Sequence, residues 1–246
     1  WRFARICPSH LKYVWDAYSA QGRLSIAYRL LRGELDWRIE GLPKIIYACT
    51  TCRACDVMCK LFEDMETGEI LLELRAEAVE RGIGPMPEHK RFTDWTDKEH
   101  NPYMEKHVDR LKWVPKAVEV AKKADTAYFV GCTSSYRRTE IAEATVKTFN
   151  TIGVDFMLLH PEEWCCGSPM YRTGQRKLFI DLMKHNVEAI RKAGVKRVIT
   201  SCAGCYETFK VNYPRFLGEN LGFEVLSTVE FLNTLIKEGK LKLNKE

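Results

Sequence analysis

The stretch Thr126-Ala-Tyr-Phe-Val-Gly-Cys132 combines a short apolar run with a glycine and a cysteine at its end. Such a run, bounded by a turn signal, is typical of a strand buried on both faces. Similar strands are expected at 155–159, 197–200 and 223–226, and helices at 139–150, 175–193, 206–212 and 228–237. The alternation predicts an α/β domain with a small parallel sheet that helices cover on both faces.

Cysteines follow three of these predicted strands. Cys132 ends the first, Cys165-Cys166 follows the second and Cys202-Ala-Gly-Cys205 follows the third, with 32 residues before the pair and 35 after it. The carboxyl ends of parallel strands share one edge, where open α/β sheets bind ligands. We therefore expect five thiols at one site, which is one more than a tetrahedral zinc ion accepts.

A second cysteine run, Cys49-Thr-Thr-Cys52-Arg-Ala-Cys55-Asp-Val-Met-Cys59, lies nearer the N-terminus. The spacing C-x2-C-x2-C-x3-C is the bacterial ferredoxin run, in which three thiolates bind one cluster and the fourth serves another. Structural zinc sites instead pair two cysteine knuckles across a longer loop. The spacing therefore favours a [4Fe-4S] cluster on the first three cysteines.

Cys7 is followed by Pro8, the pair that ends such a run. We expect Cys7 to complete the cluster of the first three cysteines, and Cys59 to serve a second [4Fe-4S] cluster whose other ligands lie outside this chain. One departure is that Lys60, not a proline, follows Cys59. The alternative for Cys7 is a small buried apolar residue.

Composition excludes several classes of protein. The chain has 246 residues, ten cysteines and a net charge of +5. No apolar run approaches the ~18 residues of a membrane span, and no basic block points to nucleic acid. Disulfide frameworks are typical of small secreted domains, whereas this chain is long and shows no signal-peptide pattern. We infer that its cysteines bind metal.

We divide the chain into three parts. Residues 1–80 are expected to form a helical ferredoxin-type domain that is N-terminally incomplete, and 81–125 a linker followed by a helix. Residues 126–246 are the α/β domain, so the fold class is α+β overall. The chain begins without Met and stops after the fourth strand and its helix, so we expect a piece of a longer protein. Further helices are expected over 13–32, 66–80 and 104–124.

Together these motifs resemble the CCG cysteine-rich domain of heterodisulfide reductases. The resemblance rests on Gly131-Cys132, Cys165-Cys166-Gly167-Ser-Pro and Ser201-Cys202-Ala-Gly-Cys205, and both gaps fall within the family's spacing. A ferredoxin module before such a domain is similar to the D-type polypeptide of these enzymes, in which the C-type and B-type polypeptides are fused. Similar iron–sulfur subunits occur in glycolate, lactate and glycerol-3-phosphate oxidoreductases, in electron-transfer-flavoprotein:quinone oxidoreductases and beside tungsten-containing benzoyl-CoA reductase. The family usually has two CCG motifs, and this chain has one.

The resemblance implies an oxidoreductase subunit in which ferredoxin-type clusters pass electrons to a CCG-type [4Fe-4S] cluster that reduces a disulfide. That cluster, noncubane or cubane, would use Cys132, Cys165, Cys166, Cys202 and Cys205. Two alternatives stay open: an electron conduit without its own substrate, and a zinc-stabilised interaction module. The resemblance also implies partner subunits that contain flavin, iron–sulfur, quinone or tungsten centres, a small disulfide substrate, and a reducing cytoplasm or the inner face of the membrane through a partner.

Overall fold

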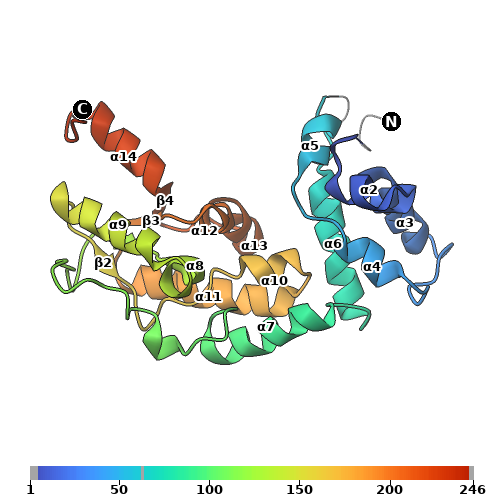
Figure 1. Ribbon diagram of the computed structural model, residues 1–246, viewed down its shortest axis with the longest axis horizontal. Coiled ribbons are helices and arrows are strands. Elements are labelled where there is room, and N and C mark those ends of the chain that lie inside the picture. The colour runs from blue at the N-terminus through green and yellow to red at the C-terminus, as the bar shows by residue number, and fades with distance from the viewer. Residues whose placement is uncertain (1–4, 62–63, 244–246) are drawn as a thin grey trace. The chain divides into compact units, whose positions relative to one another are not determined.

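The computed structural model describes residues 5–61 and 64–243 (Figure 1). Residues 1–4, 62–63 and 244–246 lie outside this description. The chain forms two compact units: unit 1 is Trp1–Arg91 with Pro169–Arg176, and unit 2 is Phe92–Ser168 with Lys177–Glu246. Within the described residues, every helix is too short or too polar to cross a membrane.

Unit 1 is helical, as predicted for its sequence. Apolar residues at helical spacing in three of its helices share one core, formed by Ala27, Leu30, Leu42, Ile46, Leu74 and Ala78. Its elements are α2 (Pro8–Tyr13), η1 (Asp16–Tyr18), α3 (Ala20–Leu31), α4 (Leu42–Tyr47), α5 (Ala54–Cys59), α6 (Thr67–Glu80), the start of α7 (Pro87–Glu99) and nearly all of α10 (Ser168–Arg172).

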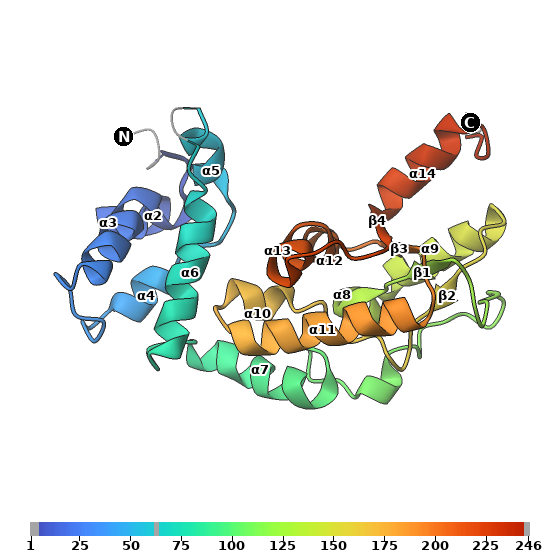
Figure 2. The same ribbon diagram turned by 180° about the vertical axis from the view of Figure 1, so that it is seen from behind.

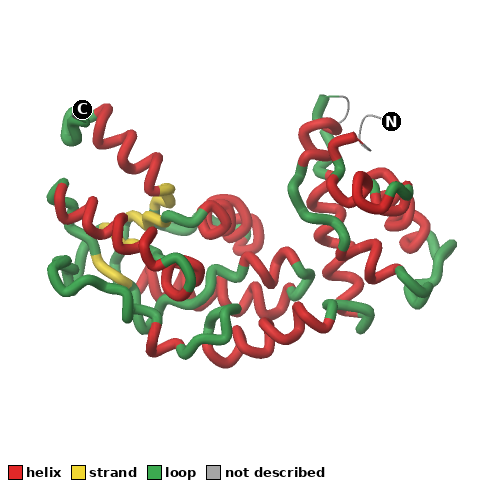
Figure 3. Tube along the Cα trace, in the orientation of Figure 1, coloured by secondary structure: helices red, strands yellow, loops and turns green. Residues whose placement is uncertain are grey.

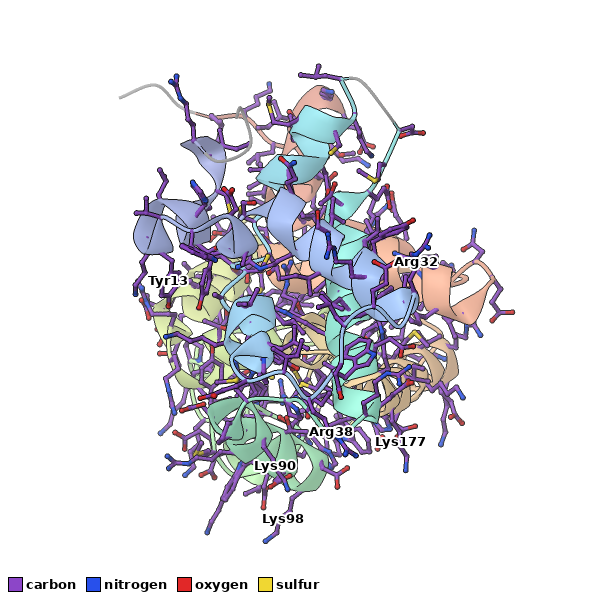
Figure 4. All side chains as sticks on the ribbon, turned by 90° about the vertical axis from the view of Figure 1, so that its right-hand side faces the viewer. Tyr13, Arg32, Arg38, Lys90, Lys98 and Lys177 are labelled. Carbon is purple, nitrogen blue, oxygen red and sulfur yellow. The ribbon has the colours of Figure 1, made fainter. Side chains whose placement is uncertain are left out.

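The helix predicted over 13–32 is wrong in its first part. Val14 has a left-handed backbone (φ 51°) and ends α2, and the backbone N–H of Gly22 donates to Ser19 Oγ, which caps α3. A side chain at Gly22 would lie 2.0 Å from the carbonyl oxygen of Asp16, so the turn before α3 needs a glycine there. Figure 4 labels Tyr13 at the end of α2 and Arg32 just after α3.

The region before the sheet also differs from its prediction. Helix α7 occupies residues predicted to be a linker, and the helix predicted over 104–124 is absent except for the short η2 (His107–Asp109). Figure 3 shows this stretch as loop. Pro115 would interrupt a helix, and the apolar residues of this stretch instead pack against the sheet's core as irregular chain. These residues are Leu111, Trp113, Val114, Val118 and Val120.

Unit 2 contains a four-stranded sheet in the order β2-β1-β3-β4. The strands are β1 (Thr126–Tyr128), β2 (Met157–Leu158), β3 (Arg197–Thr200) and β4 (Glu224–Ser227). Every pairing is parallel, with Ala127 opposite both Met157 and Val198, and Val198 opposite Val225. The prediction of a small parallel sheet is confirmed, and β1 and β2 are shorter than predicted.

Helices cover both faces of this sheet (Figure 2). On one face Tyr128 packs edge-on against Phe149 of α9, and Phe149 in turn packs against Phe231 of α14. On the other face Phe129 packs against Phe209. The α/β prediction is therefore confirmed, although residues 208–212 of the helix predicted over 206–212 form a π-helix. The helices are α8 (Gly131–Tyr136), α9 (Thr139–Thr151), α11 (Arg176–Lys192), α12 (Ala203–Glu207), the π-helix η3 (Thr208–Asn212), α13 (Tyr213–Leu217) and α14 (Thr228–Lys237).

Candidate metal centres

Three strand ends in unit 2 bring together the five cysteines expected at one site. Cys132 lies in the first turn of α8 after β1, and Cys165 and Cys166 lie in the loop between β2 and α10. Cys202 is the N-cap of α12 after β3, and Cys205 lies within that helix. Cys202 is half-buried and the other four are buried. The site therefore exists only where the sheet aligns these three strand ends.

The five thiols adjoin one another in a continuous row. Cys165 lies between Cys132 and Cys166, and Cys205 lies between Cys166 and Cys202. These contacts lower the pKa of Cys132, lower that of Cys166 further, and bring the pKa of Cys202 to about 6. The same contacts raise the pKa of Cys165 and Cys205 well above the usual thiol value. Adjoining sulfurs that favour the thiolate at alternate positions are suited to a soft metal centre.

Glycine makes room for this row at two positions. Gly131 has φ +74°, and a Cβ on it would lie 3.0 Å from Cys205 Sγ. Gly167 has φ +82°, and its Cβ would lie 2.9 Å from the ring of Phe179. Both positions need the left-handed backbone that glycine adopts without strain.

Buried polar side chains fix the backbone of the adjacent cysteine pair. Asn186 Nδ2 donates to the Cys165 carbonyl at 3.0 Å, and Tyr213 Oη donates to the Cys166 carbonyl at 2.9 Å. Asn186 Oδ1 accepts from the backbone N–H of Trp164 at 3.1 Å. Neither Asn186 nor Tyr213 was predicted from the sequence to take part in the site. The sequence did contain one sign of Asn186, because this polar residue interrupts the apolar face of α11.

A buried ion pair also borders the site. Arg110 Nη1 donates to Glu163 Oε1 at 2.8 Å, and Arg110 Nη2 lies 3.5 Å from Cys132 Sγ. Burial alone lowers the pKa of Arg110, but the charges of Cys132 and Glu163 outweigh it and raise that pKa above the usual value. This ion pair was not predicted from the sequence, because 52 residues lie between its two members.

Aromatic rings shield the chain beside Cys165. The indole of Trp164 is stacked between His100 and His185, with ring centroids 3.6 and 3.4 Å away. Burial lowers the pKa of His100 to about 4, so this ring is neutral near pH 7. The carbonyl of His100 accepts from the backbone N–H of Cys165 at 2.9 Å. The stack therefore covers the backbone next to the thiols.

In unit 1, four of the five ferredoxin-type cysteines line one hollow. These are Cys7, Cys49, Cys52 and Cys55. Thr51 and Arg53 have left-handed backbones (φ 55° and 59°), which coil the loop between the cysteines. Cys52 is exposed and the other three are half-buried. Burial, and then the charge of Asp56, raise the pKa of Cys55 to about 12.

Two buried arginines hold the segments that border this hollow. Arg23 Nε donates to the Ile45 carbonyl at 2.7 Å, and its Nη2 donates to Ser9 Oγ at 3.0 Å. Arg75 Nη2 donates to the Cys49 carbonyl at 2.5 Å. Because these acceptors lie on the segments of Cys7 and Cys49, the two arginines fix those segments to α3 and α6.

Cys59 lies apart from this group. It is buried at the end of α5, is not among the residues that line the hollow, and accepts a hydrogen bond from Thr67 Oγ1 at 3.2 Å. The structure therefore separates Cys59 from the other four cysteines of its run.

Both donor sets fit iron–sulfur ligation by their chemistry. One supplies four thiols around a single hollow and the other supplies five adjoining thiols, and thiolates are the ligands of such clusters. In residues 5–61 and 64–243, no three His, Cys, Asp or Glu side chains stand as a ready-made site for a metal ion.

Comparison with known proteins agrees with these motifs. The family described as CCG, Cysteine-rich domain, matches residues 126–210. The chain is 44% identical over 212 residues, 84% of its length, to the D-type polypeptide of the dihydromethanophenazine:CoB–CoM heterodisulfide reductase of Methanosarcina mazei. It is 42% identical over 237 residues, 95% of its length, to the polypeptide of the same name from Methanosarcina barkeri. An EtfAB:quinone oxidoreductase of Syntrophomonas wolfei is 32% identical over 212 residues, 81% of the chain.

These matches cover only part of each relative. The chain spans 51% of the Methanosarcina mazei protein, 56% of the Methanosarcina barkeri protein and 29% of the Syntrophomonas wolfei protein. No solved structure is significantly similar to the chain. The chain is therefore homologous to part of the D-type polypeptide of heterodisulfide reductase, and its residues 126–210 form a CCG cysteine-rich domain.

Proposed function

We propose that this chain passes electrons from a ferredoxin-type [4Fe-4S] cluster in unit 1 to a CCG-type cluster in unit 2, where a disulfide is reduced. The observation that supports this most directly is the continuous row of five thiols at three strand ends. A structural zinc ion accepts four ligands, whereas five adjoining thiols at a ligand-binding sheet edge suit a multi-iron centre.

The ligand assignment follows the placement of the sulfurs. Cys7, Cys49, Cys52 and Cys55 would hold the ferredoxin-type cluster, because they line one hollow. Cys59 would serve a second [4Fe-4S] cluster with ligands outside this chain. The five CCG cysteines, Cys132, Cys165, Cys166, Cys202 and Cys205, would hold the third cluster, cubane or noncubane.

When bound, such clusters supply single electrons at a potential set by ligands, hydrogen bonds and solvent exposure. Reduction of one disulfide consumes two electrons and two protons, breaks the S–S bond and releases two thiols. The electrons would come from a partner redox subunit of the flavin, iron–sulfur, quinone or tungsten class. Asn186 and Tyr213 would hold the cysteine pair in place, and the stacked ring of Trp164 would keep water from its backbone.

The names of the relatives suggest the substrate class. The Methanosarcina proteins are named for the CoB–CoM heterodisulfide, and we propose a mixed disulfide of two small thiols as the substrate here. The similarity to an EtfAB:quinone oxidoreductase favours a second candidate, an electron conduit with no substrate of its own.

The test uses the full-length protein in its native complex, purified without oxygen. Metal analysis, Mössbauer and EPR spectroscopy are expected to find iron and sulfide in the number of the proposed clusters, with little zinc. A reductant and a heterodisulfide should then give turnover, and addition of the product thiol should change the CCG-cluster EPR signal. If zinc is found in place of iron, the result would favour the alternative function of a zinc-stabilised interaction module. Iron without turnover or a thiol effect would favour the conduit.

A further inference from the structure

A buried positive charge lies against the CCG cysteines, and it comes from outside the matched domain. Arg110 precedes residues 126–210, and its side chain is 0% exposed. Its Nη2 approaches Cys132 Sγ at 3.5 Å, which is within reach of a hydrogen bond to sulfur. The guanidinium of Arg110 therefore places a positive charge in direct contact with the row of thiols.

The remaining donors of Arg110 are only partly satisfied. Nη1 donates to Glu163 Oε1 at 2.8 Å and Nη2 also donates to the His100 carbonyl at 3.2 Å. The buried Nε–H has no hydrogen-bond partner among the residues that the structure describes. One N–H group of Arg110 therefore has no acceptor among the described residues.

Glu163 holds the other side of the pair. Its carboxylate is 1% exposed and accepts from the backbone N–H groups of Val130 at 3.0 Å and Gly131 at 2.9 Å. A buried ion pair rarely stabilises a fold more than apolar residues of the same size would, so stability gives a weak reason for this one. Its charges act strongly on their surroundings because the site is shielded from water.

We propose that Arg110 is a positioning residue that raises the reduction potential of the CCG cluster, with Glu163 moderating its charge. This inference rests on the proposed function, since it needs a cluster on Cys132 and its neighbours. A cluster gains negative charge on reduction, and a nearby guanidinium stabilises that charge. Hydrogen bonds and charge near the sulfurs are established means of setting such potentials.

The test compares variants of the full-length protein in its complex by redox titration monitored through the CCG-cluster EPR signal. Arg110→Gln is expected to lower the midpoint potential so that the ratio of reduced to oxidised cluster changes tenfold or more, which is about 59 mV for one electron. Glu163→Gln is expected to raise it, and Arg110→Lys to lower it less than Arg110→Gln. The control is Arg137→Gln, which removes the same charge from an exposed arginine paired with Glu105 at the end of α8.

Opposite shifts in Arg110→Gln and Glu163→Gln would support the proposal, because loosened packing alone would move both potentials the same way. Shifts in the same direction, or no tenfold change in either, would overturn it. Where Arg110→Gln retains no iron, Glu163→Gln decides, and an unchanged or lower potential contradicts the proposal. A wild-type protein that has the ferredoxin-type signal but lacks the CCG signal overturns the proposed function itself.

Discussion

The two cysteine sites are built in opposite ways. In unit 1, three of the four thiols that line the hollow lie within the seven residues from Cys49 to Cys55, and Cys52 is exposed. In unit 2, five thiols come from three strand ends far apart in sequence, and four of them are buried. A local loop closes at little entropic cost, whereas the second site requires the finished sheet. The first site is therefore the more accessible one, and the second depends more on its fold.

The largest effect is expected from replacing a cysteine in one site while the other site is left intact. Cys166→Ser is expected to remove the CCG-cluster EPR signal and to lower disulfide turnover on the order of 10³-fold or more, the scale of losing a group that acts in the reaction. The reason is that Cys166 lies in the middle of the sulfur row, between Cys165 and Cys205. EPR spectra and turnover by the complex measure both effects.

Cys52→Ser is the matched control for that substitution. It should weaken the ferredoxin-type signal and leave the CCG signal in place. Loss of both signals from either variant would show that the two centres are not separate, and the contrast drawn between the units would then be wrong.

The rate of iron removal should also differ between the two sites, although this effect is smaller than that of the cysteine substitutions. A water-soluble chelator is expected to take iron from unit 1 roughly tenfold or more faster than from unit 2, which corresponds to ~1.4 kcal/mol in the free energy of local opening. The physical reason is the exposure of Cys52 against the burial of Cys132, Cys165, Cys166 and Cys205. The decay of each EPR signal with time measures the two rates, and equal rates would contradict the prediction.

Local patterns in the sequence predicted much of this architecture. The ferredoxin spacing identified a set of thiols that the structure gathers around one hollow, and the apolar runs identified all four strands. The helix predicted over 228–237 has the same bounds in the structure, where Ser227 and Glu230 form a capping box at its start. Signals of this kind are confined to a few neighbouring residues.

Features that depend on distant contacts were not predicted. The irregular chain of 104–124 has apolar residues at nearly helical spacing, but the sheet's core and Pro115 decide its conformation. The buried pair of Arg110 and Glu163 could not be predicted, because in the sequence each is an ordinary charged residue and only the fold buries them together. Arg23 and Arg75 were missed for the same reason, since their acceptors are mainly backbone carbonyls.

A third test compares the packing around one glycine in each unit, Gly167 in unit 2 and Gly33 in unit 1. Gly167→Ala is expected to lower the free energy of unfolding by ~2–4 kcal/mol, because it adds overpacking against Phe179 to left-handed strain. Gly33 in unit 1 also has a left-handed backbone (φ +71°), but the space around it is open. Gly33→Ala is therefore expected to cost only ~1 kcal/mol of backbone strain. Denaturant unfolding of the two variants measures the difference, and equal losses would show that space at Gly167 does not matter.

The smallest expected effect concerns helix caps, one in each unit. Ser19 is buried, donates to the Asp16 carbonyl at 2.8 Å and accepts from the backbone N–H of Gly22 at 3.0 Å. Ser227 accepts from the backbone N–H of Glu230 at 3.2 Å at the more accessible start of α14. Replacement of an N-cap serine by alanine costs ~1 kcal/mol.

Ser19→Ala should exceed Ser227→Ala, because it also leaves the Asp16 carbonyl without its donor in a buried place, and ~2 against ~1 kcal/mol is expected. Native-state hydrogen exchange distinguishes the two, since α3 amides should lose protection in the first variant and α14 amides in the second. If Ser227→Ala cost as much as Ser19→Ala, burial would not explain the difference between the caps. Because Ser19 also lies next to Tyr18, whose carbonyl accepts from Ser9 and Arg23, its loss should further speed iron release from the hollow of unit 1.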